Sequence, residues 1–220
     1  MKLVSHFYIV AVPQAGLRYA MGINMHVFII YCHPSDDSFT YNVKTEFIKG
    51  LQKASHTWVI SDLYKMNFNT EFMEKDYLRE AYYQRDPAIA DDVLQEQRKI
   101  QEADAIVFIY PVFWTEAPAK LIGWFDRVWT YGFAYGENIE MKLLNKALVL
   151  ATTGRSIHNL IQSDQAQAME TVMLGDRINY RAKEKQIVFL DGMSREDKFN
   201  SREKNWEKHL EKVYQLGSNF

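Results

Sequence analysis

Apolar and polar positions divide most of the chain into alternating strand-like and helix-like segments. Continuous apolar runs of strand length occur at residues 27–31, 57–61, 105–110, 146–151 and 186–190. A continuous run, unlike an alternating one, is typical of a parallel strand that is covered on both faces. Apolar residues also recur at helical spacing, for example from Phe39 to Leu51 and from Leu121 to Trp129. The alternation predicts an α/β fold with a doubly wound, parallel, five-stranded sheet.

Residues that favour helix termini stand at the expected helix ends. Ser38 is a good N-cap for the helix after the first strand, and Pro118 suits the first turn of the helix after the third strand. The last helix carries the apolar residues Phe199, Trp206, Leu210, Val213 and Leu216. Gly217 is expected to end this helix.

The turns after the first and third strands are the predicted ligand site. Open parallel sheets bind ligands beyond the carboxyl ends of their strands, where the winding direction reverses. In a sheet of order 2-1-3-4-5 that point lies between strands one and three. The corresponding turns here are residues 32–40 and 111–118.

The chemistry of these turns fits a flavin, which presents an anionic phosphate and a planar ring. Ser38 opens a helix whose first N–H groups, those of Phe39 and Thr40, suit a phosphate, and His33 adds a donor or a positive charge. The alternative is that Ser38 only caps its helix and that His33 only bonds within the turn.

Wall and edge residues for the ring are present as well. Pro111, Phe113 and Trp114 offer an apolar wall, and Thr152, Thr153 and Gly154 form a small polar turn after the fourth strand, in which glycine lets N–H groups approach a ligand closely. A tryptophan at a strand end is more often part of the core, so this alternative stays open for Trp114.

Composition limits the remaining possibilities. A chain of 220 residues with 47% hydrophobic content can bury one sizeable core, so residues 25–220 are predicted to form one domain. The formal net charge of −2 gives no reason to expect nucleic acid as a partner. Cys32 is the single cysteine, which excludes an intrachain disulfide and fits a reducing, cytoplasmic compartment. We interpret Cys32 as a small packed residue.

Two regions fit the pattern less well. Residues 1–24 are interpreted as an N-terminal extension, too short in apolar sequence for a membrane span, so no integral membrane segment is expected. Residues 63–90 are too long for a plain connection. Their aromatic residues could cover the sheet, line a site or contact a second subunit: Phe68, Phe72, Tyr77, Tyr82 and Tyr83.

Other chemistries lack a signal in the sequence. No His, Cys, Asp and Glu cluster has metal-ligand spacing, and no GxGxxG, GxxxxGK[ST] or GxSxG motif occurs. His158 is interpreted as a surface residue. Asp126 and Arg127 are interpreted as a structural ion pair or packing contact.

Several motifs in one order resemble the NAD(P)H:quinone oxidoreductase family, the flavodoxin-like quinone reductases that include DT-diaphorase and bacterial relatives. The matching segments are residues 31–34 and 38–39, DLYKMNF at 62–68, 110–114, 118–119, GWFDRV at 123–128, 132–136 and TTG at 152–154. The resemblance covers residues 25 to about 154 and is loose beyond them.

The resemblance implies a homodimer with each active site near the subunit interface. It implies a bound flavin, FAD or FMN, reduced by NADH or NADPH and reoxidised by a quinone or a similar two-electron acceptor. His33, Ser38 and Phe39 would hold the phosphate side, and Tyr135 would face the nicotinamide or quinone. The remaining contacts would be Pro111, Val112, Phe113 and Trp114 at the ring, and Thr152, Thr153 and Gly154 at its polar edge.

The chain also departs from the family pattern. Thr40 stands where the family often has Asn, and Arg155 stands where a second glycine is common. Ala166 falls at about the place of the histidine that assists the pocket tyrosine in DT-diaphorase. These differences leave open whether the flavin is FAD or FMN. They also leave open two other functions: a flavodoxin-type electron carrier, or a non-catalytic regulatory subunit such as the ancillary proteins of potassium efflux systems.

Overall fold

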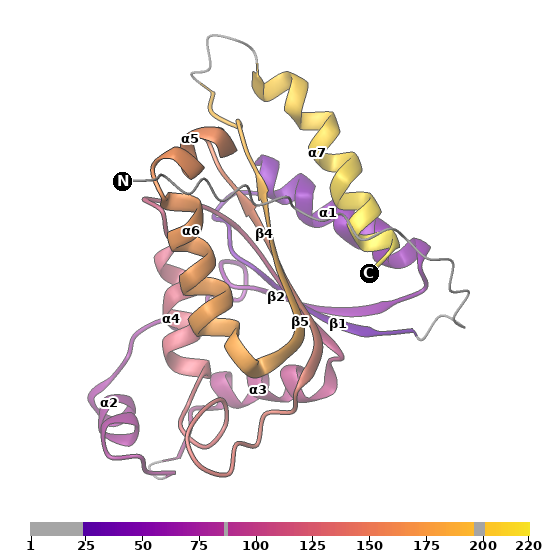
Figure 1. The fold of residues 1–220 in the computed structure, drawn as a ribbon. Helices are drawn as coiled ribbons and strands as arrows, with labels where there is room; N and C mark the ends of the chain where they lie inside the picture. The colour runs from indigo at the N-terminus through magenta and orange to yellow at the C-terminus, as the bar shows by residue number, and fades with distance from the viewer. Residues whose placement is uncertain (1–23, 86–87, 196–200) are drawn as a thin grey trace, which may run out of the picture.

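A five-stranded parallel sheet forms the centre of the computed structural model, which describes residues 24–85, 88–195 and 201–220 (Figure 1). Its strands lie in the order β2-β1-β3-β4-β5. Their bounds are β1 (His26–Tyr31), β2 (Thr57–Asp62), β3 (Ala105–Pro111), β4 (Leu144–Thr152) and β5 (Ala182–Leu190). All four neighbouring pairs are parallel. The predicted doubly wound sheet of flavodoxin-like order is confirmed.

The strands that the apolar runs predicted are present, and three of them begin earlier than predicted, β1 by a single residue. β3 is buried along its whole length, as a central parallel strand requires. β4 begins at Leu144 and β5 at Ala182, although polar residues such as Lys146 and Glu184 interrupt the apolar pattern there. β5 is one of the two edge strands, and the side chains of its residues 183–186 are exposed while its backbone pairs with β4.

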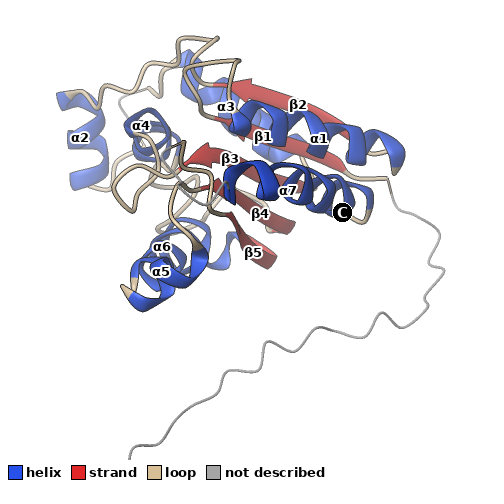
Figure 2. Cartoon of the chain, turned by 90° about the horizontal axis from the view of Figure 1, so that it is seen from above, coloured by secondary structure: helices blue, strands red, loops and turns tan. Residues whose placement is uncertain are grey.

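Helices cover both faces of the sheet (Figure 2). On one face, α1 (Phe39–Lys53) and α7 (Ser201–Ser218) pack side by side over the core around Val107 and Leu148. On the other, α3 (Asp91–Glu102) and α4 (Ala119–Val128) cover the core around Phe108 and Trp124. Between β4 and β5 the chain forms α5 (Ile157–Gln162), α6 (Gln165–Glu170), the π-helix η1 (Thr171–Ile178) and the 3₁₀-helix η2 (Asn179–Arg181).

Two expected helix termini differ from the structure. Gly217 lies within α7 instead of ending it, and its glycine serves packing against α1, since a Cβ on Gly217 would lie 2.4 Å from the backbone oxygen of Phe47. Pro118 is the N-cap of α4, one residue before its first turn. Phe199, expected in the last helix, lies outside the described residues, as do residues 1–23 of the expected N-terminal extension.

The long segment after β2 carries α2 (Glu74–Ala81), which lies at the lower left in Figure 1, away from the sheet. Phe68 covers the core and is buried. In contrast, the four other aromatic residues singled out in this segment are exposed: Phe72, Tyr77, Tyr82 and Tyr83. Phe68 therefore covers the sheet, whereas the other four do not, and the choice between lining a site and contacting a second subunit stays open for them.

Two observations concern only the part of the chain that the structure describes. None of its helices is long and apolar enough to cross a membrane. Within the same residues, no group of three or more His, Cys, Asp and Glu side chains is arranged to hold a metal ion.

Candidate active site

The turns after β1, β3 and β4 meet at one end of the sheet and line a common cavity of about 410 Å³. All but one of the residues expected to contact a flavin line it: His33, Ser38, Phe39, Thr40, Pro111, Val112, Phe113, Thr152, Thr153 and Gly154. The exception is Trp114. Segments separated by more than a hundred residues thus converge where the strand order predicted a ligand site.

The N-terminus of α1 offers hydrogen-bond donors to this cavity. Ser38 is the N-cap, and its Oγ accepts a hydrogen bond from the Tyr41 N–H at 3.0 Å. The N–H groups of Phe39 and Thr40 precede the first residue that can bond within the helix, so they remain for a ligand. A helix N-terminus with free N–H groups favours an anion such as a phosphate.

His33 bonds within this turn through its ring. Its Nδ1 lies 3.0 Å from the Ser35 N–H and 2.9 Å from the Ser35 carbonyl oxygen. Burial lowers the pKa of His33 below its ordinary value. At neutral pH we therefore expect the imidazole to act through hydrogen bonding, and the positive charge considered from the sequence is not favoured.

Positive charge comes instead from residues that the sequence reasoning missed. Arg195 and Arg202 line the same cavity, together with Met193. Arg202 Nη1 donates to the Met193 carbonyl at 2.7 Å, and its guanidinium lies 4.9 Å from the centre of the Trp206 ring. Arg195 follows the fifth strand, so the rule that pointed to the other turns could have found it.

The turn after β3 holds its residues in strained conformations. Phe113 and Glu116 pair across the turn, and Trp114 and Thr115 have φ values of 52° and 65°. Left-handed φ is uncommon for residues with a Cβ and costs energy that the surrounding structure must offset. Trp114 is 100% exposed, so the alternative that it belongs to the core is wrong.

A second cavity of about 460 Å³ adjoins the first at Val112, Thr153 and Gly154, which line both. Trp114 and Arg155 line only the second one. The two cavities together therefore present an end with the N-terminus of α1 and two arginines and a neighbouring end with an exposed indole.

Hydrogen bonds join the walls of this second cavity. Arg155 Nη1 donates to Gln165 Oε1 at 2.6 Å, and Gln165 Nε2 donates to Thr115 Oγ1 at 2.6 Å. Gln165 thus ties the turn after β4 to the strained turn after β3. Arg155 is exposed, and this hydrogen bond holds it at the rim of the second cavity.

The turn after β4 is fixed by its neighbours while leaving room for a ligand. The Thr152 and Thr40 hydroxyls lie 2.8 Å apart, which joins this turn to α1. Thr153 N–H donates to the Leu190 carbonyl at 3.0 Å. A Cβ on Gly154 would come no closer than 3.8 Å to other protein atoms, so packing does not require glycine there.

Tyr135 is not brought to these cavities. It follows α4, whereas the turn after β3 precedes α4, and a helix of ten residues separates the two by about 15 Å. Tyr135 lines a different cavity of about 510 Å³ with Trp129, Arg177 and Tyr180. Its hydroxyl donates to Glu80 Oε2 at 2.5 Å.

Three simpler interpretations from the sequence agree with the structure. Cys32 is fully buried, and burial raises the pKa of its thiol to about 12, so it is a packed residue. His158 is exposed. Arg127 is structural, although its partner is Asp92 and not the adjacent Asp126.

Comparisons with known proteins agree with this architecture. A family model described as "Flavodoxin-like fold" matches residues 25–213. The solved structure of an NAD(P)H:quinone oxidoreductase from Methanothermobacter marburgensis superposes with a TM-score of 0.83 at 39% identity, covering 90% of this chain and 97% of that one.

Curated relatives have related names. NAD(P)H dehydrogenase (quinone) 1 of Cavia porcellus is 29% identical over 224 residues, or 91% of this chain and 79% of that protein. Ribosyldihydronicotinamide dehydrogenase (quinone) of Homo sapiens is 36% identical over 124 residues, or 50% of this chain and 53% of that protein. The chain thus spans about half the length of the ribosyldihydronicotinamide dehydrogenases that it matches. The chain belongs to the flavodoxin-like fold family that includes the NAD(P)H:quinone oxidoreductases.

Proposed function

We propose that this protein is an NAD(P)H-dependent flavin oxidoreductase that reduces a quinone or a similar two-electron acceptor. The observation that carries the proposal is the convergence of three turns on one cavity with a helix N-terminus at its edge. The names of its relatives supply the reaction class, because fold alone does not define activity.

The residues present fit a flavin. Ser38, Arg195 and Arg202 provide N–H donors and positive charge for one phosphate of FMN or two of FAD, with His33 as a further hydrogen-bonding group. Pro111, Val112, Phe113 and Trp114 would border the ring, and Thr152, Thr153 and Gly154 would meet its polar edge. When bound, the flavin accepts a hydride from NADH or NADPH and passes it to the acceptor.

A homodimer follows from this proposal. Tyr135 lies at the far end of α4 from the cavities, so the Tyr135 that faces the nicotinamide or quinone would come from a second copy of the chain. Exposed apolar side chains that an interface could cover support this arrangement: Phe72, Met73, Tyr77, Tyr82 and Tyr83. The single buried cysteine is compatible with the proposed cytoplasmic location.

Two other functions use the same fold. A flavodoxin-type electron carrier would bind a flavin without oxidising NADH or NADPH, and a regulatory subunit of the potassium-efflux type would act without turnover. The net charge of −2 gives little field for steering a redox partner, which disfavours the carrier.

Steady-state kinetics separate the three. We expect oxidation of NADH or NADPH that depends on both added benzoquinone and bound FMN or FAD. A carrier would retain flavin and show no such oxidation. Lack of turnover in flavin-loaded protein, with a functional effect only on a membrane partner, would support the regulatory subunit and refute the enzyme.

Trp114→Ala is expected to weaken flavin affinity by roughly 1–3 kcal/mol, the scale of an aromatic contact and its buried area. Because the indole is fully exposed in the single chain, the stability of the flavin-free protein should change by less than about 0.5 kcal/mol. Calorimetric titration and urea unfolding measure the two quantities. Leu143→Ala, which removes another exposed apolar side chain, is the control. Unchanged flavin affinity in Trp114→Ala would remove Trp114 from the proposed site.

Arg155→Gly is expected to lower the two-electron reduction potential of the bound flavin by roughly 30 mV, or about 1.4 kcal/mol. A guanidinium in the second cavity favours the negative charge that the flavin gains on reduction. Arg155→Lys keeps the charge and should retain most of the potential. Redox titration with dyes measures both variants. Identical potentials and affinities in the wild type and Arg155→Gly would show that Arg155 only holds Gln165.

A further inference from the structure

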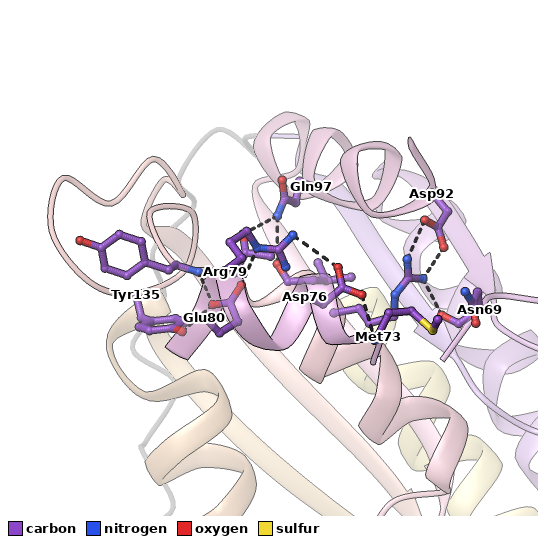
Figure 3. A network of polar contacts seen from close by, with 12 residues as sticks. Asn69, Met73, Asp76, Arg79, Glu80, Asp92, Gln97 and Tyr135 are labelled. Carbon is purple, nitrogen blue, oxygen red and sulfur yellow. Dashed lines mark hydrogen bonds and ion pairs between the residues drawn. The ribbon is translucent and has the colours of Figure 1, made fainter. Parts of the chain in front are cut away.

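One carboxylate, that of Glu80, joins α2 to the loop that carries Tyr135. Glu80 Oε2 accepts hydrogen bonds from the Tyr135 hydroxyl at 2.5 Å and from the Tyr131 backbone N–H at 2.8 Å (Figure 3). The partners are 51 and 55 positions apart in sequence, so the loop conformation depends on α2. Glu80 therefore determines both where the Tyr135 hydroxyl lies and what it bonds.

Arg79 forms an ion pair with this carboxylate. Its Nε donates to Glu80 Oε1 at 2.7 Å, and its Nη1 lies 3.5 Å from Asp76 Oδ1. The Arg79 side chain is only 2% exposed, so it depends on these carboxylates for charge compensation. An ionised carboxylate is a stronger acceptor than a neutral one.

The Tyr135 hydroxyl consequently uses its proton in the hydrogen bond to Glu80. An ionised carboxylate can only accept, so Tyr135 is the donor in this bond. Burial and then the hydrogen bond to Glu80 raise the pKa of Tyr135 above its ordinary value. The Tyr135 oxygen keeps its lone pairs for other partners and can serve a ligand only as an acceptor.

Tyr135 lines a cavity, so the direction of its hydrogen bonding can affect a ligand bound there. Its titratable side chains are Asp126, Asp176, Arg177, Tyr180 and Arg181, and the two carboxylates formally balance the two guanidiniums. Tyr83 and Tyr131 also lie next to Tyr135. Because the lining has no formal excess charge, hydrogen-bond direction at Tyr135 is a feature that can select a ligand.

We propose that Glu80 is a positioning residue that makes Tyr135 a fixed hydrogen-bond acceptor for a ligand group carrying an N–H or O–H. The inference rests on the proposed function, in which Tyr135 faces the nicotinamide or the quinone. A nicotinamide carboxamide and a hydroquinone product both supply such a donor, whereas a quinone carbonyl does not.

A double-mutant cycle tests the inference with the wild type, Glu80→Gln, Tyr135→Phe and the double variant. Glu80→Gln should lower kcat/KM for NADH, or weaken product inhibition by hydroquinone, by roughly tenfold, the scale of one hydrogen bond to a charged group. Reduced 3-acetylpyridine adenine dinucleotide lacks the carboxamide N–H and should be insensitive to the variant if NADH supplies the donor. In the Tyr135→Phe background, Glu80→Gln should have no further effect. Equal losses in both backgrounds would mean that Glu80 acts on the fold alone and would overturn the proposal.

Glu140→Gln is the matched control, because Glu140 lies on the same loop and pairs with Arg85 instead of Tyr135. It should leave all these constants unchanged.

NMR of protein with ¹³C-labelled tyrosine gives a readout that needs no turnover. The Tyr135 resonance, assigned by its loss in Tyr135→Phe, should titrate at lower pH in Glu80→Gln. An inactive wild type refutes the proposed function and with it this role of Glu80. An active wild type whose Tyr135 titration does not move refutes the inference alone.

Discussion

Ser38→Asp is expected to weaken binding of FMN or FAD by about 2–4 kcal/mol, because it brings a carboxylate against the flavin phosphate at the N-terminus of α1. Two like charges about 4 Å apart near a protein surface repel by about 4 kcal/mol, and salt reduces this value. Aspartate is as good an N-cap as serine, so α1 should still form. Isothermal titration at low and moderate salt measures the loss and its screening.

Ser38→Asn is the control, since asparagine caps equally well and carries no charge. Its flavin affinity should remain close to that of the wild type, and the free energy of unfolding of the flavin-free protein should be similar in both variants. If Ser38→Asp and Ser38→Asn bind flavin equally well, Ser38 only caps its helix and the phosphate lies elsewhere.

Trp124→Ala is expected to reduce the free energy of unfolding by about 3–5 kcal/mol, the range for a fully buried large side chain. Trp124 is 0% exposed and packs against Phe108 and Trp129. Its Nε1 also donates to Glu96 Oε2 at 2.8 Å, so the truncation leaves a buried carboxylate without this donor. Urea unfolding with an unchanged slope measures the loss as stability.

Trp124→Phe separates the two contributions. It keeps an aromatic ring in the core and removes the N–H, so its loss should be smaller, about 1–3 kcal/mol for a Glu96 Oε2 left without its donor, while Lys99 and Ser61 still bond Glu96 Oε1. A Trp124→Ala protein as stable as the wild type would contradict the packing described around α4.

Much of the architecture is present in the local sequence. Continuous apolar runs identify the strands, because a parallel strand covered on both faces has no polar side to interrupt the run. The turns after β1, β3 and β4 could be named as the site because the topology of such a sheet fixes where ligands bind. The cap at Ser38 also follows from local chemistry.

The features that could not be predicted depend on distant partners. Gly217 serves the close crossing of α7 and α1 at Gly50 and not the end of its helix, a contact that no local pattern contains. Arg79 is buried only because Asp76 and Glu80 compensate its charge and the rest of the chain covers it. Tyr135 matched a family motif, yet its distance from the cavities depends on the direction of α4.

Flavin uptake by the purified protein tests the central claim most directly. We expect one FMN or FAD per chain, measured by absorbance of the flavin released on denaturation and by titration of flavin-free protein. Binding should also raise the unfolding temperature, because a ligand that binds only the folded state stabilises it. A colourless protein that takes up neither flavin, and gains no thermal stability from either, would contradict the account.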